Sequence, residues 1–154
     1  MTQEGSTLPS SRSEAWSYLE ERFGVERQEL EEYQLEKISG DFWLVSRETE
    51  TELDTETKGI RFLRDKERGL KPTTYALQFL GDSIERNVVE VSQDELLKLA
   101  RREEMIDRDL EEDGYVALKF QNRIVGCGFY KNDKVSSRIP KGRSKELSRI
   151  LEKL

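Results

Sequence analysis

The chain has 154 residues, of which 38% are charged, and its net charge is −6. Histidine is absent and cysteine occurs once, as Cys127, so an intramolecular disulfide, a Cys/His zinc site and every mechanism with a histidine base are excluded. No segment is apolar and long enough to cross a bilayer and no secretory signal opens the chain, so we expect a soluble cytoplasmic protein. No Gly-rich phosphate loop is present either. We therefore also expect a protein that has no cofactor or metal and is not an enzyme.

The N-terminal part of the chain, residues 1–57, is strongly acidic, with a net charge of −10. Residues 1–10 are small and polar, and we expect them to be disordered. Ser11 and Glu14 fit a capping box, and the apolar residues after them repeat with helical spacing, which predicts a short amphipathic helix. The acidic segment 47–57 has no apolar periodicity and is expected to be a flexible loop or a connector between strands.

A first hairpin is predicted between this helix and the acidic segment. Leu35–Ile38 and Phe42–Ser46 are typical of two short strands, and the turn residues 39–41 separate them. Trp43 lies inside the second run. An indole ring can stack on a nucleobase, but the apolar run favours a position in the core.

The next segment contains the first concentration of positive charge, because residues 58–71 carry six basic and two acidic side chains. Lys58–Arg64 alternates like a strand, with Arg61 opposite the apolar side chains, and a basic loop is predicted over Asp65–Lys71. Pro72 is expected to open a short helix. The basic loop would then lie at a helix N-terminus, where free amides and the helix dipole also favour anions.

The last third of the chain begins with a predicted strand at Asn87–Val91. Ser92 and Glu95 form a second capping box, which indicates that a helix follows. Gly114–Phe120 and Ile124–Tyr130 are rich in β-branched and aromatic residues, and only three residues separate them. These two runs predict a second hairpin.

Two glycines, Gly126 and Gly128, flank Cys127 in the second strand of this hairpin, and glycine in a strand often marks a close approach by a ligand or another backbone. Cys127 has apolar neighbours and no adjacent cation, so we expect a buried, unreactive thiol. A basic loop around Pro140 follows, and a final amphipathic helix is predicted over Leu147–Leu154. This order is typical of a small β module that presents a basic loop to a phosphate-bearing partner; a plain hairpin with a solubilising tail is the alternative.

Three regions of the chain together resemble PUA-type RNA-binding domains: Lys58–Arg61 with the downstream Pro72, Val88–Leu99, and Gly114–Gly128. The closing run Arg138–Arg143 is similar to the Pro-Lys-x-x-Arg ending of the C-terminal domain of Sun-type RNA cytosine-5 methyltransferases. The chain also looks like the small ribosome-biogenesis factors built from a pre-PUA half and a PUA half. The resemblance covers residues 58–154, and residues 1–57 are similar only in general shape.

The chain departs from the methyltransferase domains in two places. Residues 101–105 lack the glycine that usually follows the capped helix, and Gly142 and Arg143 are adjacent instead of having the family's spacing. The chain also contains no Pro-Cys catalytic motif and no Gly-rich cofactor turn. The resemblance therefore implies the RNA-binding module without the enzyme.

These observations predict an α+β protein with a disordered N-terminus (1–10), a pre-PUA-like α/β half (11–57) and a PUA-like half (58–154) that is a mixed β barrel with flanking helices. We expect a non-catalytic protein that binds structured rRNA or tRNA in RNA modification or ribosome assembly. An RNA-modifying enzyme or a pre-ribosomal particle would be a further partner, and neither DNA nor a membrane is expected.

The predicted RNA-binding residues are the cations of the two basic segments, namely Lys58, Arg61, Arg64, Lys66, Arg68, Lys71, Arg138, Lys141, Arg143 and Lys145. The resemblance further implies that Gly126 and Gly128 let the RNA backbone come close. Two other functions fit the sequence. One is an adaptor whose acidic half docks on a methyltransferase or a ribosomal protein, and the other is an enzyme that uses carboxylates alone.

Overall fold

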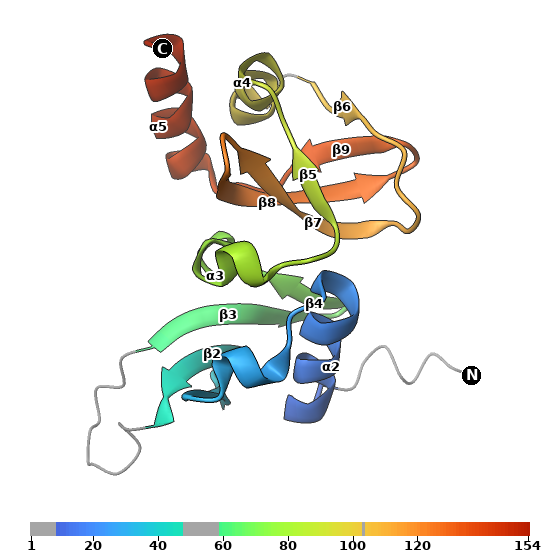
Figure 1. Cartoon of the computed structure of the whole chain (residues 1–154), viewed down its shortest axis with the longest axis vertical. Coiled ribbons are helices and arrows are strands. Elements are labelled where there is room, and N and C mark those ends of the chain that lie inside the picture. The colour runs from blue at the N-terminus through green and yellow to red at the C-terminus, as the bar shows by residue number, and fades with distance from the viewer. Residues whose placement is uncertain (1–8, 48–58, 103) are drawn as a thin grey trace. The chain divides into compact units, whose positions relative to one another are not determined.

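A computed structural model describes residues 9–47, 59–102 and 104–154 (Figure 1). The chain divides into two compact units, an N-terminal unit of residues 1–86 and a C-terminal unit of residues 87–154. Helices and two β-sheets are present, so the fold is α+β as predicted. None of the helices in the described ranges is long and apolar enough to cross a membrane.

The N-terminal unit is built around an antiparallel sheet with the strand order β1-β2-β3-β4. Most buried side chains of the unit come from this sheet and from the helices α2 and α3, and Val25, Leu30 and Ile84 add to them from the connecting segments. In chain order, the elements are α2 (Arg12–Phe23), the 3₁₀ turn η1 (Arg27–Leu30), β1 (Tyr33–Ile38), β2 (Asp41–Ser46), β3 (Gly59–Lys66), β4 (Gly69–Pro72), α3 (Thr74–Leu80) and the 3₁₀ turn η3 (Gly81–Ser83).

Helix α2 begins at the predicted capping box. Ser11 Oγ accepts a hydrogen bond from the Glu14 amide at 3.1 Å, and the Glu14 carboxylate accepts one from the Ser11 amide at 2.8 Å. These two bonds satisfy amide groups that a helix start otherwise leaves without partners. The helix ends at Gly24, whose φ of 68° is the left-handed conformation typical of a glycine cap.

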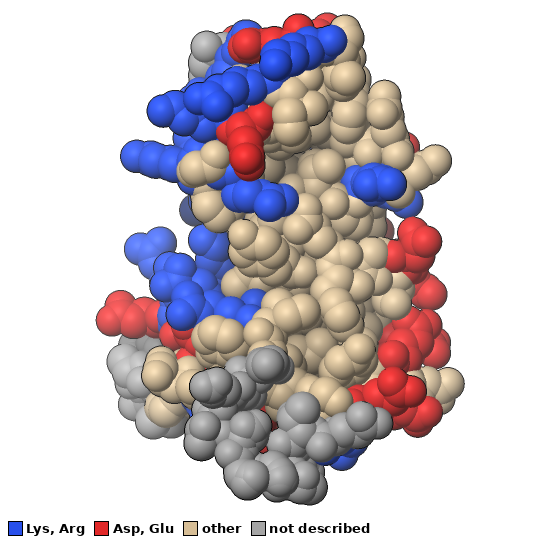
Figure 2. All heavy atoms as spheres, turned by 90° about the vertical axis from the view of Figure 1, so that its left-hand side faces the viewer, with Lys and Arg blue, Asp and Glu red and all other residues tan. Residues whose placement is uncertain are grey.

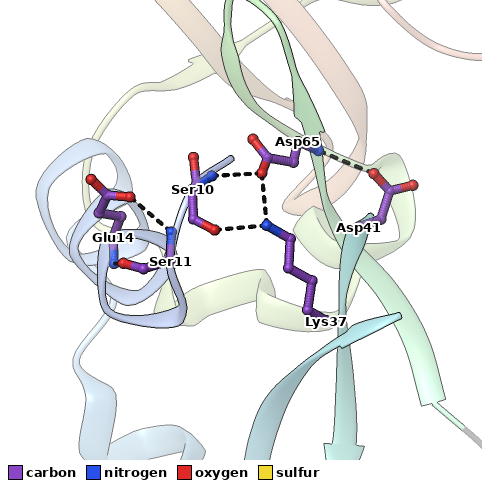
Figure 3. A network of polar contacts seen from close by, with 6 residues as sticks. All are labelled: Ser10, Ser11, Glu14, Lys37, Asp41 and Asp65. Atoms are coloured by element: carbon purple, nitrogen blue, oxygen red, sulfur yellow. Dashed lines mark hydrogen bonds and ion pairs between the residues drawn. The ribbon is translucent and has the colours of Figure 1, made fainter. Parts of the chain in front are cut away.

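Ser10, which precedes the Ser11 N-cap of α2, is tied to the sheet by the hydrogen-bond network in Figure 3. The Asp65 carboxylate of β3 accepts hydrogen bonds from the Ser10 amide at 2.8 Å and from Lys37 Nζ at 3.1 Å, and Lys37 Nζ also donates to the Ser10 carbonyl at 2.7 Å. Burial raises the pKa of Asp65, but these hydrogen bonds outweigh it and hold the pKa below its usual value. Ser10 is therefore an ordered part of the unit; the rest of the predicted disorder, residues 1–8, lies outside the described residues.

Two predictions about the basic segment need correction. The predicted loop over Asp65–Lys71 is a hairpin, because β3 continues to Lys66 and pairs with β4 through Arg64 and Lys71. Helix α3 does not begin at Pro72, which is the last residue of β4, but follows the side-chain cap of Thr73. The cations therefore stand on a β-ribbon and not in front of a helix N-terminus.

The boundary between the units also lies elsewhere than predicted. The sequence suggested a division at residues 57 and 58, whereas the structure divides the chain after Arg86. The reason is that β3 and β4 pair with β2 and complete the N-terminal sheet. Strand pairing over this distance leaves no local signal in the sequence.

The C-terminal unit is a mixed sheet with the strand order β5-β7-β8-β9-β6, in which β5 is parallel to β7 and the other pairs are antiparallel. Helices α4 and α5 contact each other, and Leu99 of α4 and Leu151 of α5 belong to the same buried core as the sheet. In chain order, the elements are β5 (Val88–Glu90), α4 (Gln93–Arg101), β6 (Ile106–Asp107), β7 (Gly114–Phe120), β8 (Arg123–Lys131), β9 (Lys134–Ser137) and α5 (Lys141–Glu152).

The predicted second hairpin is confirmed as β7 and β8, joined at Gln121 and Asn122, which both have positive φ. Cys127 is buried, as expected. Strands β6 and β9 were not predicted. Helix α5 begins at Lys141, so the basic residues expected in a loop form the first turns of a helix.

Gly128 is a point of close approach, but its neighbours belong to the protein itself. A Cβ at this position would lie 3.0 Å from Val135 Cγ1, 3.1 Å from Leu118 Cδ2 and 3.1 Å from the Ser136 carbonyl oxygen. Both Gly128 and Gly126 are buried. The prediction that these glycines admit an RNA backbone is therefore wrong, since the space above Gly128 is filled by the core of the sheet.

We expect Gly128→Ala to destabilise the C-terminal unit by about 1–3 kcal/mol, because the added methyl group overpacks this contact. Gly142→Ala in α5 is the matched control. No atom lies within 4 Å of the Cβ that it adds, and alanine should stabilise the helix by about 0.5–1 kcal/mol. Urea unfolding followed by circular dichroism measures both changes; equal effects of the two substitutions would contradict the packing explanation.

Candidate nucleic-acid interface

Several basic residues of the C-terminal unit line two adjoining hollows between the end of α4, the end of β9 and the start of α5. One hollow of about 350 Å³ is lined by Arg102 and Arg138, among others. The other, of about 650 Å³, is lined by Arg102, Lys141 and Lys145. Because Arg102 lines both, we treat them as one groove, the α4–α5 groove, defined by Arg102, Arg138, Lys141 and Lys145.

Arg102 holds an unusual backbone position. It caps the C-terminus of α4 with φ 59° and ψ 30°, the left-handed conformation that residues other than glycine seldom adopt. Its guanidinium donates a hydrogen bond to the Ile139 carbonyl, between β9 and α5. The side chain is thereby directed across the groove from the helix end that carries it.

Arg138 is anchored on the opposite wall. Its amide donates to the Cys127 carbonyl at 2.8 Å, and its guanidinium donates to Ser136 Oγ at 2.9 Å. The same guanidinium lies over the ring of Phe129, 5.2 Å from the ring centre. These contacts orient the side chain without neutralising its charge, since none of the three partners is an anion.

The first turns of α5 are electrostatically unfavourable for the helix itself. Pro140 provides no side-chain cap and the first turn contains no acidic residue, whereas Lys141 and Arg143 place positive charge at the positive end of the helix dipole. Lys141 and Lys145 are four residues apart, so they also repel each other. Both are exposed, and no carboxylate in the described part of the chain pairs with them. A bound anion would relieve both effects.

Neighbouring cations of the unit are neutralised. Arg101 pairs with Glu152 at 2.6 Å, and Lys98 pairs with Glu104 at 3.5 Å. The cations of the groove differ from these two neighbours, because no carboxylate of the described residues lies within ion-pair distance of them. Figure 2 faces the side on which α5 lies in Figure 1, and blue side chains gather in its upper part, where α5 lies.

The Glu95 carboxylate, at the N-terminal end of α4, helps to hold this helix in place. Glu95, in the predicted second capping box, accepts from the Ser92 amide at 3.0 Å and from both terminal nitrogens of Arg108 at 2.9 Å. The hydrogen bonds from Arg108 lower the pKa of Glu95 to about 2, although burial acts in the opposite direction. Arg108 also donates to the Glu90 carbonyl, so this pair joins α4 to β5 and the segment after β6.

The predicted residues of the N-terminal unit form a second basic surface on the β3–β4 hairpin. Lys66 and Arg68 are exposed at its tip, and no carboxylate among the described residues pairs with either. Arg61 and Arg64 lie near Asp41, at 3.5 and 4.0 Å. Lys58 lies outside the described residues.

Two residues of these surfaces were missed by the sequence analysis. Arg102 was part of a segment noted only for its missing glycine, and a left-handed arginine has no sequence signature; the Arg-Arg pair after a helix was the only available hint. Trp43 was expected in the core, but it is half-buried and lies under the guanidinium of Arg61.

The described residues contain no group of three or more carboxylate or thiol side chains placed to hold a metal ion. Comparisons with known proteins find no family model that matches the chain and no significantly similar curated protein.

Proposed function

We propose that this chain is a non-catalytic RNA-binding protein that binds the phosphates of a structured rRNA or tRNA and acts in RNA modification or ribosome assembly. The observation that carries the proposal is the α4–α5 groove. Its four cations come from the end of α4, the segment after β9 and the start of α5, and they line two hollows that share Arg102. Glu104 also lines one of the hollows, where it pairs with Lys98.

The chemistry of the groove suits a nucleic-acid backbone. Arginine and lysine contacts to phosphates supply most of the sequence-independent affinity of nucleic-acid-binding proteins, and double-stranded RNA is recognised mainly through shape, phosphates and 2′-hydroxyl groups. Arg102 and Arg138 present planar forks that match phosphate oxygens, whereas Lys141 and Lys145 provide exposed point charges.

We further propose that the C-terminal unit is the PUA-like domain and the N-terminal unit its pre-PUA partner. The support is the resemblance of the regions Val88–Leu99 and Gly114–Gly128, together with the element order β5-α4-β6-β7-β8-β9-α5, in which the capped strand and helix precede the hairpin. The third region, Lys58–Arg61 with Pro72, lies in the N-terminal unit and does not support this assignment. On this proposal the PUA-like part begins at Asn87 and not at Lys58.

Ultraviolet crosslinking in cells followed by sequencing of the bound RNA tests the proposal. We expect one class of structured rRNA or tRNA to be enriched, and the enrichment to be lost when Lys141 and Lys145 are both replaced by Glu. Recovery of a basic protein partner without RNA, unchanged in the Glu variant, would instead favour an adaptor that docks through its acidic residues.

A further inference from the structure

The exposed face of the N-terminal sheet carries a tryptophan among cations. Trp43 of β2 lies directly opposite Arg61 of β3, so the two side chains project from the same face. The Arg61 guanidinium lies 5.4 Å from the centre of the Trp43 ring. Trp43 is half-buried and Arg61 is exposed, unlike the buried side chains of Phe42 and Leu44 on either side of Trp43.

A β-bulge in β3 places a second arginine, Arg64, on this face. The pairing shifts between Phe42, which lies opposite Leu63, and Trp43, which lies opposite Arg61, so β3 contains one extra residue, Phe62. As a result, Phe62 and Leu63 are both buried, and Arg61 and Arg64 emerge on the same side although they are three residues apart. In a regular strand they would point to opposite faces.

The distances confirm this placement. Arg61 and Arg64 both approach Oδ2 of Asp41, at 3.5 and 4.0 Å, and Lys71 lies directly opposite Arg64 in the β3–β4 ladder. Three cations, Arg61, Arg64 and Lys71, therefore share this face with Trp43 and with two carboxylates, Asp41 and Glu36. Glu36 lies directly opposite Trp43 in the β1–β2 ladder and pairs with Arg12 at 3.9 Å. We call Trp43, Asp41, Arg61, Arg64 and Lys71 the Trp43 face.

From this geometry we propose that the Trp43 face binds an unpaired nucleotide of single-stranded RNA. The base stacks on the plane formed by Trp43 and Arg61, and Arg64 and Lys71 contact the flanking phosphates. Aromatic rings and guanidinium planes on an open sheet are the usual platform for unpaired bases, and nearby cations follow the backbone. The inference rests on the proposed RNA-binding function and adds a second kind of RNA contact to it.

Fluorescence titration tests this proposal, because the chain has only two tryptophans and Trp16 is 5% exposed. A uridine oligomer of about eight nucleotides should quench Trp43 and bind about tenfold more tightly than an abasic ribose-phosphate oligomer of equal length. Trp43→Tyr should keep most of this difference, and Trp43→Leu, which retains an apolar side chain, should abolish it. Arg61→Lys should reduce the difference while the salt dependence stays the same, because the charge is kept and the plane is lost.

Equal affinity for the uridine and abasic oligomers in the wild-type protein would overturn the inference without any substitution. Polyglutamate binding as tightly as the uridine oligomer would also overturn it, because the face would then be a general polyanion surface. In either case the proposed function stands if structured RNA still binds and depends on Lys141 and Lys145. Absence of any RNA binding by the wild-type protein would overturn both.

Discussion

Replacing Lys141 and Lys145 together by Glu should weaken binding of structured RNA by about thirtyfold near physiological salt, because two phosphate contacts are lost and two repulsions appear. The same substitution should not destabilise the protein. It should raise the free energy of unfolding by about 0.5 kcal/mol, since Glu is favourable at the positive end of the α5 dipole, whereas the repulsion between positions 141 and 145 is similar for two Lys and two Glu residues. Filter binding and thermal unfolding measure the two effects.

The same helix provides a matched control. Arg149 and Lys153 are also exposed, also four residues apart, and lie about 12 Å further along the axis of α5. Reversing both to Glu makes an identical change in net charge, but it should hardly alter RNA affinity and should lower stability, because the acidic side chains then stand at the negative end of the dipole. Equal losses of affinity from both pairs would mean that the protein responds to total charge and has no groove-specific site.

Replacing Glu95 by Ala should cost about 3 kcal/mol of stability at neutral pH. The change removes one half of a capping box and leaves the Arg108 guanidinium partly buried without its carboxylate. Asp94 is the control, because it is an exposed carboxylate in the same helical turn, and Asp94→Ala should cost about 0.5 kcal/mol. Similar losses from the two substitutions would show that Glu95 acts only on the helix dipole.

The pKa of Glu95 also determines how this contribution depends on pH. The folded-state pKa of about 2 lies below the ordinary value of 4.5, so the stabilisation is complete above pH 4.5 and is lost as the pH falls from 4.5 towards 2. Glu95→Ala removes the carboxylate that titrates, so this variant should not lose that part of the folding free energy when the pH falls. Denaturant unfolding at neutral pH and near pH 3 should therefore show a smaller difference between wild type and variant at the lower pH.

The parts of the fold that the sequence predicted well are those with local signals. The capping boxes of Ser11 and Ser92 specify helix starts through side chains three residues apart, and the β7–β8 hairpin follows from two apolar runs separated by three residues. The two-residue strand β6 depends on pairing with β9 across the chain, and that pairing has no local pattern in the sequence. Strand β9 also forms a hairpin with β8 through Asn132 and Asp133, which both have positive φ, so a local turn signal was present but was not used.

The candidate sites show the same division. Runs of lysine and arginine in the sequence identified most of the cations of the two sites. They did not show which of these cations lie close together in the structure. The bulge at Phe62 turns Arg61 and Arg64 to one face, and it exists only because β3 pairs out of step with β2. Likewise, Arg102 reaches the groove because a left-handed cap and the Ile139 carbonyl direct it there. Both features depend on tertiary contacts that neither composition nor periodicity contains.

The salt dependence of RNA binding tests the central claim most directly. For the wild-type protein and a structured RNA, the logarithm of the association constant should fall linearly with the logarithm of salt concentration. Four phosphate contacts from the α4–α5 groove correspond to a loss of about a hundredfold between about 50 and 200 mM. The variant with Glu at positions 141 and 145 should have a slope smaller by about two. Affinity that does not change with salt, or equal slopes for the two proteins, would contradict the claim that this groove holds RNA phosphates.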